Sequence, residues 1–162
     1  MGRDRKNESQ TEHFTKMTRR TMQTEAWRAL SPTAQALYPW IKLEWHGPKH
    51  NNNGSIRLSL RQAAERIGCN PKTAGRAFQD LQAKGFLVQT EGARLGVEGQ
   101  GKSPSYEITE LPRTHLSARR LFDDWRSGRD FEFKNAPTNN PAGNNGRTSS
   151  TAEIFRFKRQ ER

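Results

Sequence analysis

The chain has almost no cysteine and few apolar residues. Cys69 is the only cysteine among 162 residues, so no disulfide can form within the chain, and the composition fits a reducing compartment. Only 31% of the residues are hydrophobic, and no apolar run reaches the roughly 20 residues that a membrane-spanning helix needs. The first residues, MGRDRKNESQ, are too polar for a secretory signal. We therefore expect a cytoplasmic protein that does not enter a membrane.

Acidic residues are in deficit, and the excess positive charge is spread along the chain. The formal net charge is +11, from 28 basic and 17 acidic residues. Residues 1–23 carry six basic and three acidic groups, residues 24–125 carry 14 and 10, and residues 126–162 carry eight and four. Such an excess favours a polyanionic partner, with nucleic acid ahead of an anionic membrane surface. The alternative is a soluble protein that is basic without such a partner.

The sequence divides into a patterned centre and two polar ends. Residues 1–23 have no apolar pattern, which predicts a disordered basic arm. Residues 24–125 hold the apolar patterns and are expected to form one small domain. Residues 126–162 contain NAPTNNPAGNNGRTSST, which predicts a linker, and end in AEIFRFKRQER. This basic and aromatic tail, residues 152–162, is a candidate for docking on a protein partner.

Helix signals recur four times in the centre. Thr24, Ser31, Ser59 and Asn70 are each suited to cap a helix, and a proline follows Ser31 and Asn70 at the first helical position. Apolar residues then recur at helical spacing and predict faces that meet in a common core. The third of these stripes consists of Leu60, Ala63, Ala64 and Ile67.

Three short segments alternate like strands: SIRLS, FLVQT and SYEIT. The last two are joined by the glycine-rich EGARLGVEGQGKSP, which predicts a hairpin loop. Residues 111–125 can add a short helix that packs on the domain. The expected fold is mainly α with a small β-hairpin, in the order helix, strand, helix, helix, strand, loop, strand. This is the order of a winged helix-turn-helix.

A sharp break, Gly-Cys-Asn-Pro at residues 68–71, joins the last two helices. Because both apolar stripes must be buried, the opposite face of the final helix is left outside. Residues on this face can read base edges in a DNA major groove; they are Lys72, Thr73, Gly75, Arg76 and Gln79. Gly75 costs about 1 kcal/mol of helix stability relative to Ala, and close approach of the backbone to DNA would offset this cost. The alternative is an ordinary surface helix whose exposed side is basic.

Further residues are suited to contact the DNA backbone. A helix N-terminus attracts phosphate, so Asn70, at the start of the final helix, is a candidate for a phosphate contact. At the start of the preceding helix, the candidates are Ser59, Arg61 and Gln62. In the predicted hairpin loop, Arg94 and Lys102 are the basic candidates. Glu91 and Glu98 accompany them, so the sequence leaves open whether the wing contacts DNA.

The chain also resembles a known family of proteins. The resemblance is carried by AWRALSPTAQALY, by NNNGSIRLSLRQAAERIGCNPKTAGRAFQDLQAKGFL and by YEITELP, and it covers about residues 25–125. These segments resemble helix-turn-helix proteins of bacterial, notably alphaproteobacterial, genomes and mobile elements. Those proteins are similar in turn to the winged-helix domains of plasmid replication initiators and phage replisome organisers. The resemblance implies duplex DNA binding, with Lys72, Thr73 and Arg76 at recognition positions, and a place on nucleoid or plasmid DNA.

Catalytic, metal and cofactor motifs are not evident. His46 and His50 have the spacing of half a zinc site, but no second pair of ligands lies nearby. Asp123 and Asp124 would point in different directions on a helix, so they do not form a shared metal site. GVEGQG does not lead from a strand into a helix, as a phosphate-binding loop must. We expect no enzyme activity, no metal and no cofactor.

The sequence thus predicts a protein that binds duplex DNA in a sequence-specific manner. It would act either as a transcription regulator or as an origin binder in DNA replication. A homodimer on a palindromic site is one option. An alternative from a different class is a winged-helix scaffold for protein–protein interaction that binds DNA only weakly and without specificity. RNA binding is a third hypothesis, less favoured because no exposed aromatic platform on a sheet is evident.

Overall fold

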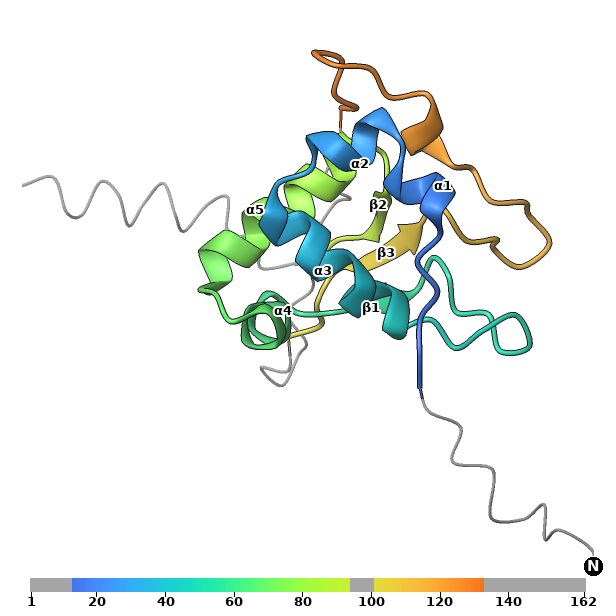
Figure 1. Cartoon of the computed structure of the whole chain (residues 1–162). Coiled ribbons are helices and arrows are strands. Elements are labelled where there is room, and N and C mark those ends of the chain that lie inside the picture. Colours follow the sequence, from blue (N-terminus) through green and yellow to red (C-terminus); the bar gives the residue numbers. More distant parts are fainter. Residues whose placement is uncertain (1–12, 94–100, 133–162) are drawn as a thin grey trace, which may run out of the picture.

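The computed structural model describes residues 13–93 and 101–132 (Figure 1). This part of the chain forms a mixed α/β domain with five α-helices, one 3-10 helix and a small antiparallel sheet. In chain order the elements are α1 (Arg19–Met22), α2 (Glu25–Ala29), α3 (Pro32–Leu43), β1 (Ile56–Arg57), α4 (Leu60–Ile67), α5 (Pro71–Ala83), β2 (Leu87–Glu91), β3 (Ser105–Ile108) and η1 (Leu121–Asp123).

The helix starts predicted from the sequence are confirmed. The side chains of Thr24, Ser31, Ser59 and Asn70 each accept a hydrogen bond from the backbone N–H three residues further on. Such caps satisfy N–H groups that have no partner inside the helix. Gly68 ends α4 with a φ of +67°, in the left-handed region that favours glycine. The sharp break between α4 and α5 is therefore encoded locally.

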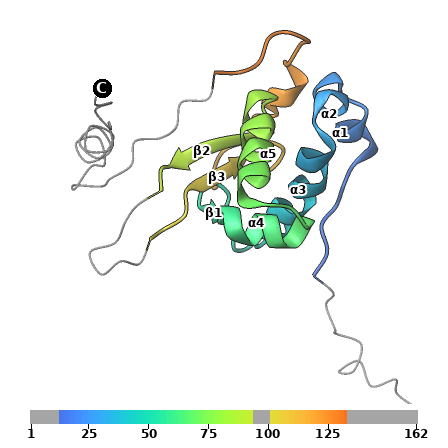
Figure 2. The ribbon, with the colours of Figure 1, turned by 90° about the vertical axis from the view of Figure 1, so that its left-hand side faces the viewer.

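The sheet has three strands in the order β1-β3-β2. The expected hairpin of β2 and β3 is confirmed, with Leu87 opposite Ile108 and an irregularity between Gln89 and Glu91. β1 pairs with the other side of β3, with Ile56 opposite Tyr106. The helices α3, α4 and α5 lie together on one side of this sheet (Figures 1 and 2).

Aromatic rings from four separate segments fill the centre of the core. Trp27 and Tyr38 meet edge to face with centroids 5.7 Å apart, and both rings also contact Phe86. Phe86 is stacked on Phe122 at 4.6 Å. Burial and favourable ring geometry together stabilise such clusters. The cluster connects α2, α3, the start of β2 and η1.

Two expectations about apolar residues are wrong. The helix expected within 111–125 is reduced to η1, and Leu116 is 61% exposed, although Phe122 and Trp125 are buried. A continuous helix is prevented because His115 and Arg120 have positive φ values of 62° and 46°. Leu60, expected in the core, is 42% exposed.

Contacts with the domain begin before the expected boundary at residue 24. Thr21 is buried and donates a hydrogen bond to Glu110, and Lys42 donates to the backbone oxygen of Lys16 at 2.6 Å. This part of the expected arm therefore lies on the domain. The rest of the arm, residues 1–12, and most of the expected linker and tail, residues 133–162, lie outside the described residues.

Three consecutive asparagines hold the loop between α3 and β1. Asn51 accepts from the Trp45 indole at 3.0 Å, and Asn52 donates to the backbone oxygen of Glu44 at 2.8 Å. Asn53 is buried, accepts from the Ile108 N–H at 2.7 Å and donates to the Ile108 oxygen at 2.9 Å. The loop is thereby fixed to β3.

Among the described helices, none is long and apolar enough to cross a bilayer.

Candidate nucleic-acid interface

The exposed face of α5 carries most of the residues predicted to read DNA. Lys72, Arg76 and Gln79 are exposed, while Thr73 and Gly75 are half-buried. The other face of the helix is buried and includes Ala74, Ala77, Phe78 and Leu81. The spacing of Lys72, Arg76 and Gln79 places them along one side of the helix.

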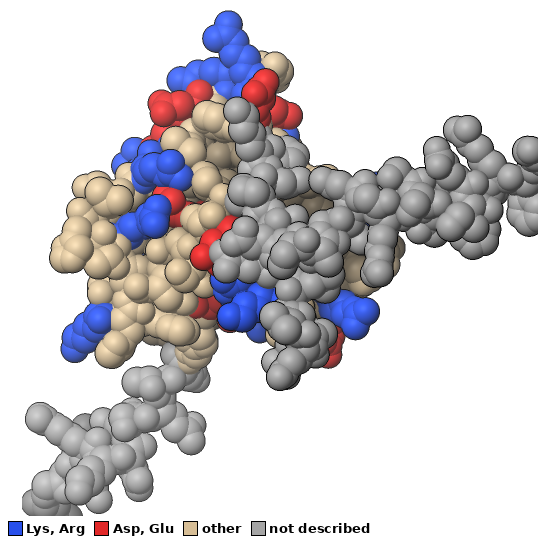
Figure 3. Space-filling view, turned by 180° about the vertical axis from the view of Figure 1, so that it is seen from behind, with Lys and Arg blue, Asp and Glu red and all other residues tan. Residues whose placement is uncertain are grey.

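The two basic residues on α5 are available to an anionic partner. In the part of the chain that the structure describes, neither Lys72 nor Arg76 forms an ion pair, whereas other basic residues do. Arg66 pairs with Glu44, and Lys84 pairs with Asp80 at 3.0 Å. Figure 3, which shows the molecule from behind, has basic and acidic side chains interspersed over the visible surface. Lys72 and Arg76 themselves are not neutralised by an acidic side chain of the described domain.

The start of α4 lies next to α5 and contains three predicted backbone contacts. Ser59 and Gln62 form a capping box, in which Ser59 Oγ accepts from the Gln62 N–H at 3.2 Å and Gln62 Oε1 accepts from the Ser59 N–H at 3.1 Å. Arg61 is exposed between them. The cap uses acceptor groups of Ser59 and Gln62, so Arg61 is the residue of the three best suited to a phosphate.

Of the other residues predicted to contact the DNA backbone, the structure describes Asn70 and Lys102 but not Arg94. Asn70 is exposed, and its Oδ1 accepts from the Thr73 N–H at 2.8 Å, so this side chain is first of all the cap of α5. Lys102 is exposed at the base of the β2–β3 loop. Arg94 lies outside the described residues. Arg57 pairs with Glu91 and donates to the Ser103 oxygen, which ties both ends of the loop to β1.

Gly75 is not required by the packing of the domain. Within the described part of the chain, a Cβ at this position would meet only Leu60, at 3.8 Å from Cδ1 and 4.0 Å from Cδ2, which is ordinary van der Waals contact. Leu60 therefore lies beside Gly75 and is partly exposed next to the face of α5. Leu60 is not predictable as a surface residue from its spacing in the sequence, because this spacing fits the core. Its position as the first residue of α4 is the signal that could have indicated an edge of the core.

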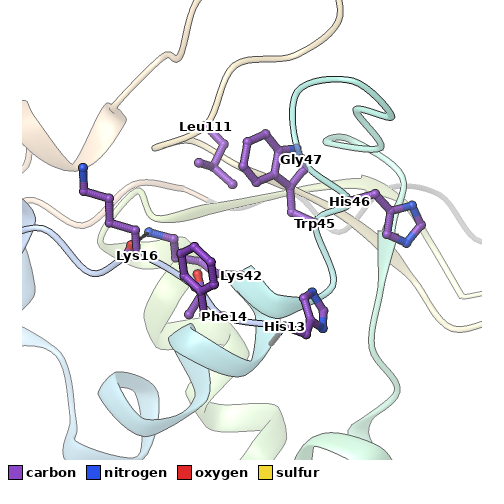
Figure 4. Close-up of a pocket in the computed structure, with 9 residues that line it drawn as sticks. His13, Phe14, Lys16, Lys42, Trp45, His46, Gly47 and Leu111 are labelled. Carbon is purple, nitrogen blue, oxygen red and sulfur yellow. Dashed lines mark hydrogen bonds between the residues drawn. The ribbon is translucent and has the colours of Figure 1, made fainter. Parts of the chain in front are cut away.

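A concave region lies on the side of the domain near residues 13–16. It has a volume of about 360 Å³ and apolar walls formed by Phe14, Trp45 and Leu111, with His13 and His46 also lining it (Figure 4). Lys42, another lining residue, is already paired with Glu110 at 2.8 Å. Among the described residues, no group of three or more His, Cys, Asp or Glu is placed to hold a metal ion.

A buried charged network lies beside this region, at the end of β3. Glu110 accepts hydrogen bonds from Tyr38 at 2.8 Å, from Lys42 and from Thr21. Burial by itself would raise the pKa of Glu110, but the hydrogen bonds from Lys42 and Thr21 and the charge of Lys42 outweigh it, and the pKa lies below its ordinary value. Burial, followed by the charge of Glu110, raises the pKa of Tyr38 well above its ordinary value. The network is therefore a fixed ion pair with a protonated tyrosine.

This charged network and the exposed face of α5 lie on different sides of the domain. In Figure 1 the end of β3 and α1 are on the right, and α5 is on the left. Comparisons with protein families, with curated proteins and with solved structures find no match for this chain. The resemblance to replication initiators and replisome organisers, and the DNA-reading roles, stay predictions.

Proposed function

We propose that this chain is a winged helix-turn-helix protein that binds duplex DNA in a sequence-specific manner, as a transcription regulator or as an origin binder in replication. The element order supports this proposal: α3, β1, α4, α5, β2 and β3 follow one another in the order of that fold. In this interpretation α5 is the recognition helix and the β2–β3 loop is the wing. The sheet order β1-β3-β2 agrees with it.

The observation that carries the proposal is the exposed face of α5. Lys72 and Arg76 are exposed there and have no acidic partner among the described residues. Arginine and lysine donate to the O6 and N7 atoms of guanine, and glutamine pairs with adenine, so Arg76, Lys72 and Gln79 can read base edges. Thr73 can contact a phosphate or a thymine methyl group. Arg61, at the start of α4, can hold the DNA backbone beside the groove.

A single pair of variants tests the role of α5. Arg76→Ala is expected to weaken binding to the preferred duplex by about 1–3 kcal/mol and to relax specificity at one base position. Arg19→Ala removes the same charge from α1, on the other side of the domain in Figure 1, and serves as the matched control. It is expected to preserve the preferred sequence.

Fluorescence anisotropy with labelled duplexes measures both affinities at one fixed salt concentration. A small and equal loss in the two variants would contradict a base contact from Arg76. That result would favour the alternative in which the domain is a scaffold for protein interaction and binds DNA weakly.

A further inference from the structure

The outer edge of β2 faces a groove. The strand order β1-β3-β2 leaves β2 with one neighbour among the described strands. A groove of about 330 Å³ lies beside it, lined by residues 87–89 of β2 together with Gln82, Leu121, Phe131 and Glu132. Consecutive strand residues point to opposite faces of a sheet, so a groove lined by three of them runs along the strand edge. Figure 2 shows β2 at the margin of the sheet.

The backbone of β2 offers hydrogen bonds to this groove. The Thr109 N–H donates to the Phe86 oxygen at 3.0 Å, and Val88 is aligned with Glu107 two residues further along the ladder. In an antiparallel ladder the residues between such pairs, here Leu87 and Gln89, direct their N–H and C=O groups away from the partner strand. An extended segment that lies along this edge can therefore continue the sheet.

The groove is lined by apolar side chains and by one carboxylate. Leu121 and Phe131 supply apolar surface opposite β2, and Glu132 adds a carboxylate. Gln82 is 5% exposed; its amide donates to the Phe78 oxygen at 3.1 Å, but its Oε1 has no hydrogen-bond partner among the described residues. The groove thus fits an extended segment with apolar and basic side chains.

We propose that this groove binds residues 153–157 of the same chain, Glu-Ile-Phe-Arg-Phe, as an added β-strand. Phe155 and Phe157 are two residues apart, so in a strand both point to one face, where Leu121 and Phe131 can cover them. Arg156 lies between them, and Lys158 and Arg159 follow, which complements the carboxylate of Glu132. The proposal does not depend on DNA binding.

The position of the groove makes this segment the favoured occupant. The described chain stops at residue 132, which is itself part of the groove wall. The sequence predicts a linker within residues 133–152, which would connect residue 132 to the proposed strand, and a flexible chain of this length would span about 25 Å on average. Such a tether gives an effective concentration of about millimolar, which favours binding within the chain over binding between chains.

Amide hydrogen exchange of the full chain, followed by NMR in dilute solution without DNA, tests the proposal. The amides of Leu87 and Gln89 are expected to be protected in the unmodified chain and to exchange about tenfold faster in Phe155→Ser. The amide of Val88 points toward β3, so it should stay protected in both proteins and reports that the sheet is intact.

Ile154→Ser is the matched control, because Ile154 would point away from the face that carries Phe155 and Phe157. It is expected to keep the protection of Leu87 and Gln89. Fast exchange of both amides in the unmodified chain would overturn the proposal, as would equal loss of protection in Ile154→Ser. Protection that rises with protein concentration would also overturn it and would indicate a second copy as the occupant.

Discussion

Gly75 is the residue at which stability and function are expected to diverge. It interrupts a helix that would be more stable with alanine, and among the described residues the only side chain within 4 Å of a Cβ at this position is Leu60. The spacing of the sequence placed Gly75 on the exposed side of α5, and the structure adds that the fold itself has room for a methyl group. The glycine is therefore explained more simply by a partner that approaches the helix than by packing.

Gly75→Ala is expected to raise the free energy of unfolding by about 1 kcal/mol because alanine favours the helical backbone. The same change is expected to weaken binding to the preferred duplex, because the added methyl group would meet the DNA. Denaturant unfolding and duplex titration measure the two effects in one variant. Greater stability with unchanged affinity would mean that the backbone at residue 75 does not approach the duplex.

Single residues also show which features could be predicted from the sequence. The helix caps Ser59 and Asn70 were predictable because a cap depends on a side chain and a backbone group only three residues away. Leu60 was not, because its spacing matches a buried stripe and only the tertiary arrangement leaves it 42% exposed. Helix caps could thus be predicted from the sequence, whereas the residues at the edge of the core could not.

At the scale of elements, the network around Glu110 connects α1, α3 and the end of β3. Thr21, Tyr38 and Lys42 all bond to this one carboxylate. The Lys42 and Glu110 side chains are only 5% and 6% exposed. Removing one partner of a buried pair leaves the other charge without compensation, which is more costly than losing an exposed pair.

Glu110→Gln is therefore expected to lower the free energy of unfolding by about 3–5 kcal/mol. The double variant Lys42→Met/Glu110→Gln is expected to recover part of this loss, because no buried charge remains. Arg20→Ala is the control: it breaks the exposed pair with Asp123, in which the side chains are 72% and 31% exposed, and should cost about 1 kcal/mol or less. Equal losses in Glu110→Gln and Arg20→Ala would contradict the role of the network.

The same network predicts a pH dependence. Because the pKa of Glu110 is lower in the folded chain than in the unfolded chain, its contribution to stability is complete above the ordinary pKa of about 4.5. The contribution is lost as the pH falls below that value through the folded-state pKa. Thermal unfolding of the unmodified chain and of Glu110→Gln, from neutral to acid pH, should show a stability difference that shrinks with acidification. A difference that is constant with pH would contradict an ionised Glu110.

The elements themselves were partly predictable. Alternation and helical spacing predicted α3, α4, α5 and the β2–β3 hairpin, because each depends on local pattern. The helix expected within 111–125 does not form in full because His115 and Arg120 adopt left-handed conformations. The spacing of apolar residues does not predict such conformations. The role of residues 51–53 was also hidden, since their contacts with Glu44 and Ile108 depend on how distant segments meet.

At the scale of the whole molecule, the positive charge is shared between the domain and the ends. Many basic residues of the domain are paired with acidic residues, as Arg119 is with Glu107 at 2.8 Å. Residues 133–162 carry six basic and two acidic groups, so they add positive charge outside the described domain. We infer that they strengthen binding through phosphates without choosing the sequence.

Removal of residues 133–162 is therefore expected to weaken DNA binding modestly, and mostly at low salt, because phosphate contacts release counterions. The preferred sequence should not change, because α5 is unaffected. Titrations of the full and shortened chains at several salt concentrations, with the same set of duplexes, measure how steeply affinity falls with salt and which duplex sequence is preferred. A changed preference would show that these residues read bases.

The central claim is that the exposed face of α5 reads DNA sequence. Selection of random duplex DNA on the purified chain at physiological salt, followed by sequencing of the enriched pool, tests it most directly. The proposal predicts a motif of several base pairs, and two-fold symmetry in that motif would indicate a homodimer. An unenriched pool, with binding that disappears as salt rises, would contradict base readout and leave only phosphate contact.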